Sequence, residues 1–229
     1  MIFTPLESGK SVEGAEVEAF KSDVNHEKYL YLMAGTHGDE VEGVYVLKKL
    51  FEWLKSDHLI SDLPIVVLPI LNIDGYCAQR RINSHSVDLN RNYPTGWKAD
   101  FKKEKNNPGS GPLSEPENQY LVKLFDKFPP GFVISFHSWK PILNFNGNAQ
   151  DVAEYLSSYN QYETADDIGY PCPGSLGSFV PTEYSAGVLT YECPVLAEGK
   201  SLEEIWNENE EGLKNLLQSD LVKKKIGFK

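Results

Sequence analysis

The stretch from residue 29 to residue 50 constrains the fold of this chain more than any other. Residues 29–34 are apolar throughout, which is typical of a buried β-strand. A short polar turn follows, and apolar residues then recur at helical spacing at Val41, Val44, Val46, Leu47 and Leu50. A strand that passes directly into a helix indicates a layered α/β fold.

Strands and helices are predicted to alternate over the rest of the chain. Further strands are predicted over residues 15–20, 63–71, 132–136 and 188–191. Helices are predicted over residues 114–125, 149–159 and 202–217, with Ser114 capping the first. Residues 57–62 are predicted to be a connector and residues 95–112 an exposed loop. The alternation predicts a single domain over residues 1–229, an α/β sandwich with a mixed, mostly parallel central sheet flanked by helices.

Charge and cysteine usage limit the partners and the location of the protein. The 229 residues include 22 Lys and Arg and 33 Asp and Glu, and the net charge of −11 argues against nucleic acid and anionic membranes as partners. No apolar run approaches the roughly 20 residues that cross a bilayer. The three cysteines lack paired spacing, and residues 1–10 lack a secretory signal pattern. We therefore expect a cytoplasmic protein, and its oligomeric state stays open.

The turn after the first buried strand reads Gly-Thr-His-Gly-Asp-Glu over residues 35–40. His37 and Glu40 lie where a strand gives way to a helix, so both side chains can point at the same position. Zinc takes imidazole nitrogen and carboxylate oxygen as ligands, and a catalytic zinc keeps one position open for water. His37 could also be a hydrogen-bonded turn residue and Glu40 the start of a solvated helix, because a bare His-x-x-Glu pattern is common.

Two more polar side chains directly follow predicted strands. His137 comes after residues 132–136, and Glu192 comes after residues 188–191. Functional sites of open α/β sheets lie beyond the carboxyl ends of the strands, so His137 and Glu192 are expected along the same edge as His37 and Glu40. His137 would complete a site of two histidines and one glutamate. Taken singly, His137 could be a structural histidine and Glu192 an ordinary rim carboxylate.

Residues 72–94 are dense in polar groups and show little periodicity, which is typical of a long surface loop or of the wall of a site. The segment contains Arg80, Arg81 and the run Val-Asp-Leu-Asn-Arg-Asn-Tyr-Pro over residues 87–94. A guanidinium can bind a carboxylate through two hydrogen bonds, and asparagine adds a neutral donor. Alternatively, Asp88 and Arg91 form a buried ion pair that braces the loop, and the two preceding arginines are surface charges.

These motifs, in this order, resemble those of the zinc carboxypeptidases of the carboxypeptidase A superfamily, and the likeness extends from about residue 29 to residue 194. Within the superfamily the chain is most similar to the murein peptide amidases, a bacterial cytoplasmic branch. This finer likeness is carried by residues 35–40, 87–94, Trp97, 114–117, 135–137, 169–170 and 173–178.

The resemblance implies a catalytic role for five residues. His37, Glu40 and His137 would be the ligands of one Zn²⁺ ion per chain. Glu192 would act as the general base and later as the acid. Arg81 would polarise the carbonyl group of the bond that is cut.

The resemblance also implies how a substrate is held. Asn90 and Arg91 would bind the terminal carboxylate of a small peptide. Tyr170 would be the mobile tyrosine that carboxypeptidases place near their substrate, although its spacing from Gly174 and Ser175 differs by about one residue.

The implied activity is hydrolysis of the γ-D-glutamyl–meso-diaminopimelate bond of free murein peptides during cell-wall recycling. A zinc-activated water would attack, with Glu192 as the base. Three alternatives stay open: a DL-carboxypeptidase that trims intact peptidoglycan, a deacylase of the desuccinylase or aspartoacylase type, and a zinc-bound interaction module without turnover. Residues 173–178 and 92–94 favour the peptidase branch over the deacylases.

Overall fold

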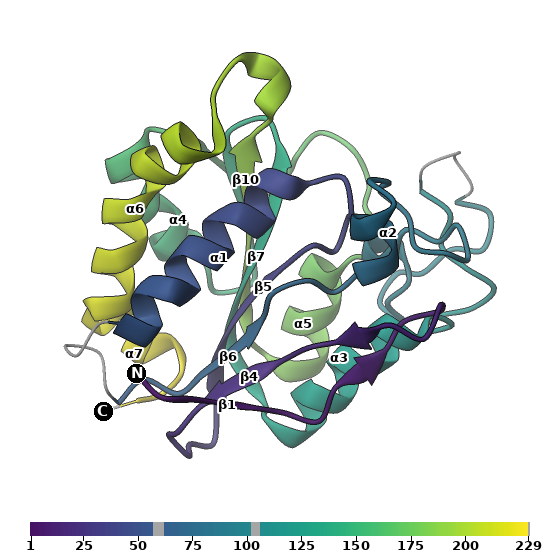
Figure 1. The fold of residues 1–229 in the computed structure, drawn as a ribbon, viewed down its shortest axis with the longest axis horizontal. Coiled ribbons are helices and arrows are strands. Elements are labelled where there is room, and N and C mark those ends of the chain that lie inside the picture. Colours follow the sequence, from purple (N-terminus) through teal and green to yellow (C-terminus); the bar gives the residue numbers. More distant parts are fainter. Residues whose placement is uncertain (57–61, 102–105, 229) are drawn as a thin grey trace.

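An eight-stranded sheet runs through the centre of the protein (Figure 1). The structure is a computed structural model that describes residues 1–56, 62–101 and 106–228. Most of the predicted connector at 57–62 and part of the predicted loop at 95–112 therefore lie outside the described residues. The strand order of the sheet is β1-β4-β6-β5-β7-β10-β8-β9, and β2 with β3 forms a separate two-stranded sheet.

Parallel pairs form the middle of the sheet, and its outer strands are joined by three antiparallel pairs and one parallel pair. The strands are β1 (Phe3–Pro5), β2 (Gly9–Lys10), β3 (Glu16–Val17), β4 (Phe20–Ser22), β5 (Tyr29–Ala34), β6 (Ile65–Leu68), β7 (Pro130–Trp139), β8 (Ile142–Asn146), β9 (Glu163–Ala165) and β10 (Gly187–Pro194). The neighbours β6, β5, β7 and β10 are parallel, as are β8 and β9. The pairs β1–β4, β4–β6 and β8–β10 are antiparallel. The prediction of a mixed, mostly parallel sheet is confirmed.

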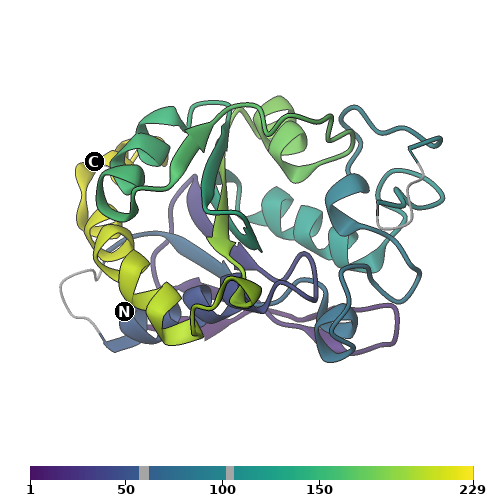
Figure 2. The ribbon, with the colours of Figure 1, turned by 90° about the horizontal axis from the view of Figure 1, so that it is seen from above.

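Helices cover both faces of this sheet, which is seen between them in Figure 2. The helices are α1 (Val41–Ser56), α2 (Ile73–Cys77), η1 (Leu89–Arg91), α3 (Pro116–Lys127), α4 (Gln150–Asn160), α5 (Leu176–Tyr184), η2 (Leu196–Glu198), α6 (Leu202–Gln218) and α7 (Asp220–Lys225). None of the helices in the described part of the chain has the length and apolar character needed to span a membrane.

Alternate residues of each central strand supply two separate cores. On one face, Leu32 and Ile134 pack with apolar residues of α1, α4, α6 and α7. On the other face, Tyr31 and Val133 pack with residues of α3 and α5. A strand covered on both faces is apolar at every position, which explains the continuous apolar run in β5. The predicted α/β sandwich is confirmed.

The predicted strand at residues 15–20 is wrong. The chain leaves the small sheet after Val17 and enters the main sheet at Phe20. Between them, the carbonyl oxygen of Ala19 accepts a hydrogen bond from the backbone N–H of Leu6 (2.8 Å). Two short strands in different sheets therefore replace one longer strand.

The predicted cap of α3 is also wrong, by one residue. Glu115 occupies the cap position, and no side chain there accepts a hydrogen bond from the first turn. The Ser114 hydroxyl instead donates to Glu115 Oε1 (2.6 Å). Elements α5, β8 and β9 were not predicted from the apolar pattern, because polar, glycine or proline residues interrupt each of them or its surroundings.

Gly38 allows the turn between β5 and α1 to lie directly against α2. A Cβ atom at residue 38 would lie 2.1 Å from the carbonyl carbon of Gly75 and 2.3 Å from the backbone nitrogen of Tyr76. Both atoms belong to the backbone of a helix, so neither can move aside independently. Only glycine fits between His37 and Glu40 at this contact.

We expect Gly38→Ala to lower the free energy of unfolding by about 1–3 kcal/mol, because the added methyl group forces the turn away from α2. Urea-induced unfolding followed by circular dichroism measures the change. Gly111→Ala is the matched control, since a Cβ at residue 111 has no heavy atom within 4 Å; its effect should stay within about 0.5 kcal/mol. Equal stabilities of the two variants would contradict the close contact at Gly38.

Candidate active site

Strand pairing places His137 and Glu192 side by side. The strands β7 and β10 are parallel, and Glu192 lies opposite His137 in their register. Paired residues of neighbouring strands point to the same face of a sheet, so both side chains face the same way. The strands also continue beyond these residues, to Trp139 and Pro194. The predicted positions of His137 and Glu192 just after their strands are therefore wrong by a few residues, and both side chains are held inside the sheet.

The turn after β5 brings two further side chains to the same place. Strand β5 ends at Ala34, which lies opposite Phe136 in β7, one residue before His137. Helix α1 then packs closely on β7, because a Cβ at Gly43 would lie 2.9 Å from the backbone nitrogen of His137. The N–H of Gly43 also donates to the hydroxyl of Ser138 (3.0 Å). This close packing sets the position of the residues just before α1.

His37, Glu40 and His137 form a tight cluster at this point. Glu40 Oε1 lies 2.6 Å from His37 Nδ1, and Glu40 Oε2 lies 2.7 Å from His137 Nδ1. The two Nδ1 atoms are 3.2 Å apart. Within the described residues, this is the group of His, Cys, Asp and Glu side chains with ligand atoms close enough together to hold a metal ion. The sequence prediction that these three side chains converge agrees with the geometry.

The second nitrogen of each histidine ring is also occupied. His37 Nε2 lies 3.0 Å from Asp88 Oδ1, and His137 Nε2 lies 3.0 Å from the hydroxyl oxygen of Ser135. These contacts fix the ring orientations and direct both Nδ1 atoms toward each other, as the outer partners of metal-binding histidines do. Ser135 is not among the site residues predicted from the sequence. Its position two residues before His137, on the same face of a strand, is the signal that points to it.

Arg81 connects the cluster to Asp88. Its Nη1 donates to Glu40 Oε1 (3.1 Å), and its Nη2 donates to Asp88 Oδ2 (3.1 Å). Asp88 is fully buried and pairs with Arg81 and His37. Among the described residues Arg91 has no carboxylate at ion-pair distance, so the alternative of an Asp88–Arg91 ion pair is wrong.

The pKa values of the two histidines of the cluster are shifted in opposite directions. Burial lowers the pKa of His37, but the charges of Glu40 and Asp88 outweigh burial and raise that pKa to about 9. For His137, burial dominates and lowers the pKa. Despite burial, the two histidines hold the pKa of Glu40 well below its usual value. Without a metal ion, the cluster therefore favours a charged His37, a neutral His137 and an ionised Glu40.

The pKa of Glu192 is raised, whereas that of Glu40 is lowered. Its burial, together with the negative charge of Glu40, raises its pKa to about 8. Its Oε2 atom is buried and has no hydrogen-bond partner among the described residues. A raised pKa in a carboxyl group that faces a cavity is typical of a residue that transfers protons.

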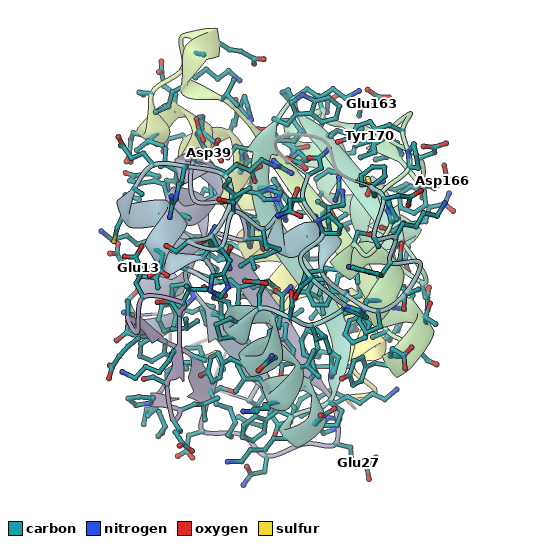
Figure 3. All side chains as sticks on the ribbon, turned by 90° about the vertical axis from the view of Figure 1, so that its right-hand side faces the viewer. Glu13, Glu27, Asp39, Glu163, Asp166 and Tyr170 are labelled. Atoms are coloured by element: carbon teal, nitrogen blue, oxygen red, sulfur yellow. The ribbon has the colours of Figure 1, made fainter. Side chains whose placement is uncertain are left out.

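A cavity of about 800 Å³ opens over the cluster. It is lined by all the predicted site residues except the buried His137. Polar residues that were not predicted also line it, among them Asp39, Ser138, Asn144, Asn146, Asp166, Ser178 and Thr190. In Figure 3, the labelled side chains of Tyr170 and Asp166 lie on one side of the view and that of Asp39 lies on the other. Tyr170 is 45% exposed, and its ring contacts Trp139 edge-on with the ring centres 6.0 Å apart.

Asn90 and Arg91 reach the cavity from η1. Asn90 Oδ1 accepts a hydrogen bond from the backbone N–H of Leu176 (2.9 Å), which ties η1 to the start of α5. Arg91 is 3% exposed; its Nη1 donates to the carbonyl oxygen of Asn90 (2.6 Å) and its Nη2 to Cys172 Sγ (3.5 Å). The guanidinium thus lines the cavity with its positive charge unpaired by a carboxylate at ion-pair distance among the described residues.

The chain is similar to known zinc carboxypeptidases and amidases over most of its length. A family model described as zinc carboxypeptidase matches residues 2–228. The murein peptide amidase A of Vibrio campbellii is 30% identical over 215 residues, which cover 88% of this chain and 84% of that protein. The murein peptide amidase A of Escherichia coli K12 is 28% identical over 211 residues, which cover 85% and 83% of the two chains.

Solved structures of similar proteins share the fold. The crystal structure of murein-tripeptide amidase from Escherichia coli O157 matches with a TM-score of 0.73 and 28% identity, over 94% of this chain and 92% of that one. Carboxypeptidase A from Helicoverpa armigera matches with a TM-score of 0.79 over 95% of this chain and 69% of that one. At 18% identity, the second match shows the fold alone.

The raised pKa values predict a pH dependence of stability in protein kept metal-free with a chelator. The stabilising contribution of charged His37 is present below pH 6.5 and is lost as the pH rises to about 9. Glu192 binds its proton more tightly in the folded state, so its contribution also falls with pH, from 4.5 to about 8. We therefore expect the free energy of unfolding to decrease between pH 6.5 and 8, where both groups titrate.

Glu192→Gln separates the two contributions. The variant lacks one of the two protons, so its unfolding free energy should depend less on pH, by up to about 1.4 kcal/mol per pH unit. Urea unfolding at several pH values in this window measures both slopes. Identical slopes for wild type and Glu192→Gln would show that the pKa of Glu192 is not raised.

Proposed function

Because the chain belongs to the zinc carboxypeptidase family, we propose that residues 1–229 form one zinc-dependent catalytic domain that hydrolyses free murein peptides. The bond cut is the one between γ-D-glutamate and meso-diaminopimelate, and the proposal places the reaction in cytoplasmic cell-wall recycling. The support for this substrate is the pair of relatives named murein peptide amidase A, matched over most of their length. The observation that carries the chemistry is the cluster of His37, Glu40 and His137 beside Glu192.

The cluster fits one zinc ion held by His37 Nδ1, His137 Nδ1 and a Glu40 oxygen. The two Nδ1 atoms are 3.2 Å apart and the Glu40 oxygens lie 2.6 and 2.7 Å from them, so all three residues could bind the same ion. Asp88 and Ser135 occupy the opposite ring nitrogens and leave both Nδ1 atoms as ligands. When bound, zinc supplies a Lewis acid for a carbonyl group and lowers the pKa of water.

Glu192 is the general base in this proposal. It faces the cluster next to His137, and its free Oε2 atom can take a proton from the attacking water. The positive charge of a bound cation favours the carboxylate form, which counters the effect of burial. As the water oxygen bonds to the carbonyl carbon, the proton moves to Glu192. Glu192 then passes it to the peptide nitrogen, which leaves as an amine when the C–N bond breaks.

Two arginines serve different parts of the substrate. Arg81 lines the cavity beside Glu40, where its guanidinium can stabilise the negative charge that develops on the carbonyl oxygen. Arg91, together with Asn90, binds the terminal carboxylate and so orients the peptide. Tyr170 lies half-exposed at the rim, where it can cover a bound peptide.

A substrate panel tests the proposed function directly. Zinc-loaded protein is incubated with L-alanyl-γ-D-glutamyl-meso-diaminopimelate, intact peptidoglycan, ordinary peptides with free C-termini, and N-succinyl and N-acetyl amino acids. Mass spectrometry of the products should show release of diaminopimelate from the free tripeptide. Preferred trimming of intact peptidoglycan would support a DL-carboxypeptidase, and preferred release of succinate or acetate would support a deacylase.

Two single substitutions should separate metal binding from catalysis. We expect one zinc per chain in the wild type, loss of zinc in His37→Ala, and full zinc content in Glu192→Gln with a kcat lower by about two or more orders of magnitude. Elemental analysis and peptide turnover measure the two properties. His26→Ala is the control, because His26 lies outside the cluster and contacts the carbonyl oxygen of Lys28. Full zinc occupancy in His37→Ala would rule out His37 as a ligand.

Arg91→Ala should weaken binding of the terminal carboxylate. A charge-assisted hydrogen bond contributes about 1.5–3 kcal/mol, so we expect kcat/KM for the free tripeptide to fall roughly ten- to hundredfold. The loss should be much smaller for a tripeptide with an amidated terminal carboxyl group. Arg80→Ala is the control, since that side chain is 41% exposed and bonds to Ser84. An equal loss on both peptides would show that Arg91 does not bind the carboxylate.

A further inference from the structure

The thiol of Cys172 lies in the cavity beside the guanidinium of Arg91. Cys172 belongs to the loop between β9 and α5 and is among the residues that line the cavity. Its Sγ atom accepts a hydrogen bond from Arg91 Nη2 (3.5 Å), and the thiol donates to the carbonyl oxygen of Tyr170 (3.7 Å). Cys77 is exposed and Cys193 is buried, whereas Cys172 is partly exposed. Small molecules in the cavity can therefore reach this thiol.

Backbone contacts hold Cys172 and Arg91 together, although 81 positions separate them in the sequence. The N–H of Tyr93 donates to the carbonyl oxygen of Gly174 (2.9 Å), and the N–H of Gly174 donates to that of Thr95 (3.1 Å). A Cβ at residue 174 would lie 2.3 Å from the carbonyl oxygen of Arg91, and the φ angle of +70° also favours glycine. The packing of the two loops thus sets the distance between the thiol and the guanidinium.

The positive charge of Arg91 is free to bind an anion. Arg91 is 3% exposed, and its Nε atom has no hydrogen-bond partner among the described residues. None of the carboxylates in the described part of the chain lies at ion-pair distance from it. A carboxylate is the group that a guanidinium binds through two hydrogen bonds. A small carboxylate held there lies within reach of Cys172 Sγ.

The environment of Cys172 favours charged reagents over neutral ones. Burial raises the pKa of the Cys172 thiol, and the charge of Arg91 opposes this effect. The thiolate is the nucleophile, so a neutral reagent meets a thiol of low reactivity. A reagent that carries a carboxylate is bound by Arg91 first, which raises its concentration next to the sulfur. Elsewhere, the net charge of −11 repels the same anion.

We propose that Cys172 is a covalent modification site for small electrophiles that carry a carboxylate group, with Arg91 as the group that binds the carboxylate. Iodoacetate is the simplest such reagent. As the sulfur bonds to its CH2 carbon, the C–I bond breaks, iodide leaves with the bonding electrons, and the thiol proton passes to solvent. The product is S-carboxymethylated Cys172, whose new carboxylate stays paired with Arg91. This inference does not depend on the proposed function.

Iodoacetate and iodoacetamide, which differ in the carboxylate and have the same leaving group, test this assignment. Zinc-loaded protein is treated with each reagent, and peptide mass spectrometry measures the rate of labelling at each cysteine. We expect the ratio of the iodoacetate rate to the iodoacetamide rate at Cys172 to exceed that at the exposed Cys77 roughly ten- to hundredfold. Equal ratios at the two cysteines, or no label at Cys172 with either reagent, would overturn the inference.

Arg91→Ala should lower this ratio at Cys172 roughly tenfold or more, because the binding group for the carboxylate is lost. The ratio is insensitive to a change in the thiol pKa, since both reagents react with the same thiolate. Arg80→Ala is the matched control: that side chain is 41% exposed and bonds to Ser84, so the ratio at Cys172 should not change. An unchanged ratio in Arg91→Ala would show that Arg91 does not bind the reagent.

A competition experiment on the wild type keeps the test decisive if Arg91→Ala fails to fold. Acetate carries the carboxylate but has no leaving group. Sodium acetate should slow the labelling of Cys172 by iodoacetate relative to sodium chloride at the same ionic strength, and the two salts should affect Cys77 equally. Equal effects of the two salts on Cys172 would also overturn the inference.

The outcomes also separate this inference from the proposed function. If Arg91 binds the terminal carboxylate of the substrate, the modified protein loses turnover of the free tripeptide, and Cys172→Ser resists this loss. Selective labelling of Cys172 with unchanged turnover would support the modification site and remove Arg91 from its role in the proposed function. Selective labelling of a wild type that cleaves none of the peptides would support the site and remove the proposed function.

Discussion

The buried carboxylate of Asp88 joins the separate segments that make up the candidate site. Its Oδ1 atom accepts from the backbone N–H of Asn90 (2.9 Å) and contacts His37 Nε2, and its Oδ2 atom accepts from Arg81 Nη2. A fully buried charge is costly unless it is paired and hydrogen-bonded, so these partners must be in place when the protein folds. One side chain thereby fixes a histidine ring, an arginine and the start of η1, the turn that carries Arg91.

The central sheet fixes the positions of two further residues of the site. His137 and Glu192 are neighbours because β7 and β10 pair in parallel register, and this pairing is set by apolar residues on both faces of the two strands. The loop residues of the site are then positioned against strand residues, as Glu40 is positioned against His137. The proposed chemistry therefore depends on this backbone pairing as well as on the segments that carry Arg81 and Arg91.

Much of this arrangement is predictable from the sequence, and the predictions that were wrong failed for identifiable physical reasons. The strand, turn and helix around His37 follow from continuous apolar runs and helical spacing, and the convergence with His137 and Glu192 follows from the common edge of a parallel sheet. The lengths of β7 and β10 were underestimated because their polar residues face a cavity, not the apolar core. Strand β8 was missed for the same reason, since Asn144 and Asn146 interrupt its apolar pattern.

Other differences between the predictions and the structure arise from contacts between segments that are distant in the sequence. Helix α5 contains Pro181 and begins in a stretch rich in glycine and serine, so its local sequence indicates a loop. Its first backbone N–H is bound by Asn90, which lies 86 residues earlier. The partner of Asp88 was similarly beyond local reasoning, because Arg81 and Arg91 are both close to it in sequence. Only the folded arrangement shows that Arg81 makes the ion pair.

The position of β10 between β7 and β8 has an evolutionary consequence. On one side β10 pairs with the strand that carries His137, and on the other with the strand that carries Asn146, and those two residues lie in different rows. Substitutions that are far apart and share no partners act on a protein nearly independently. Residues on the β8 side of β10 can therefore vary during evolution while the charges around Asp88 and the pairing of His137 with Glu192 remain unchanged.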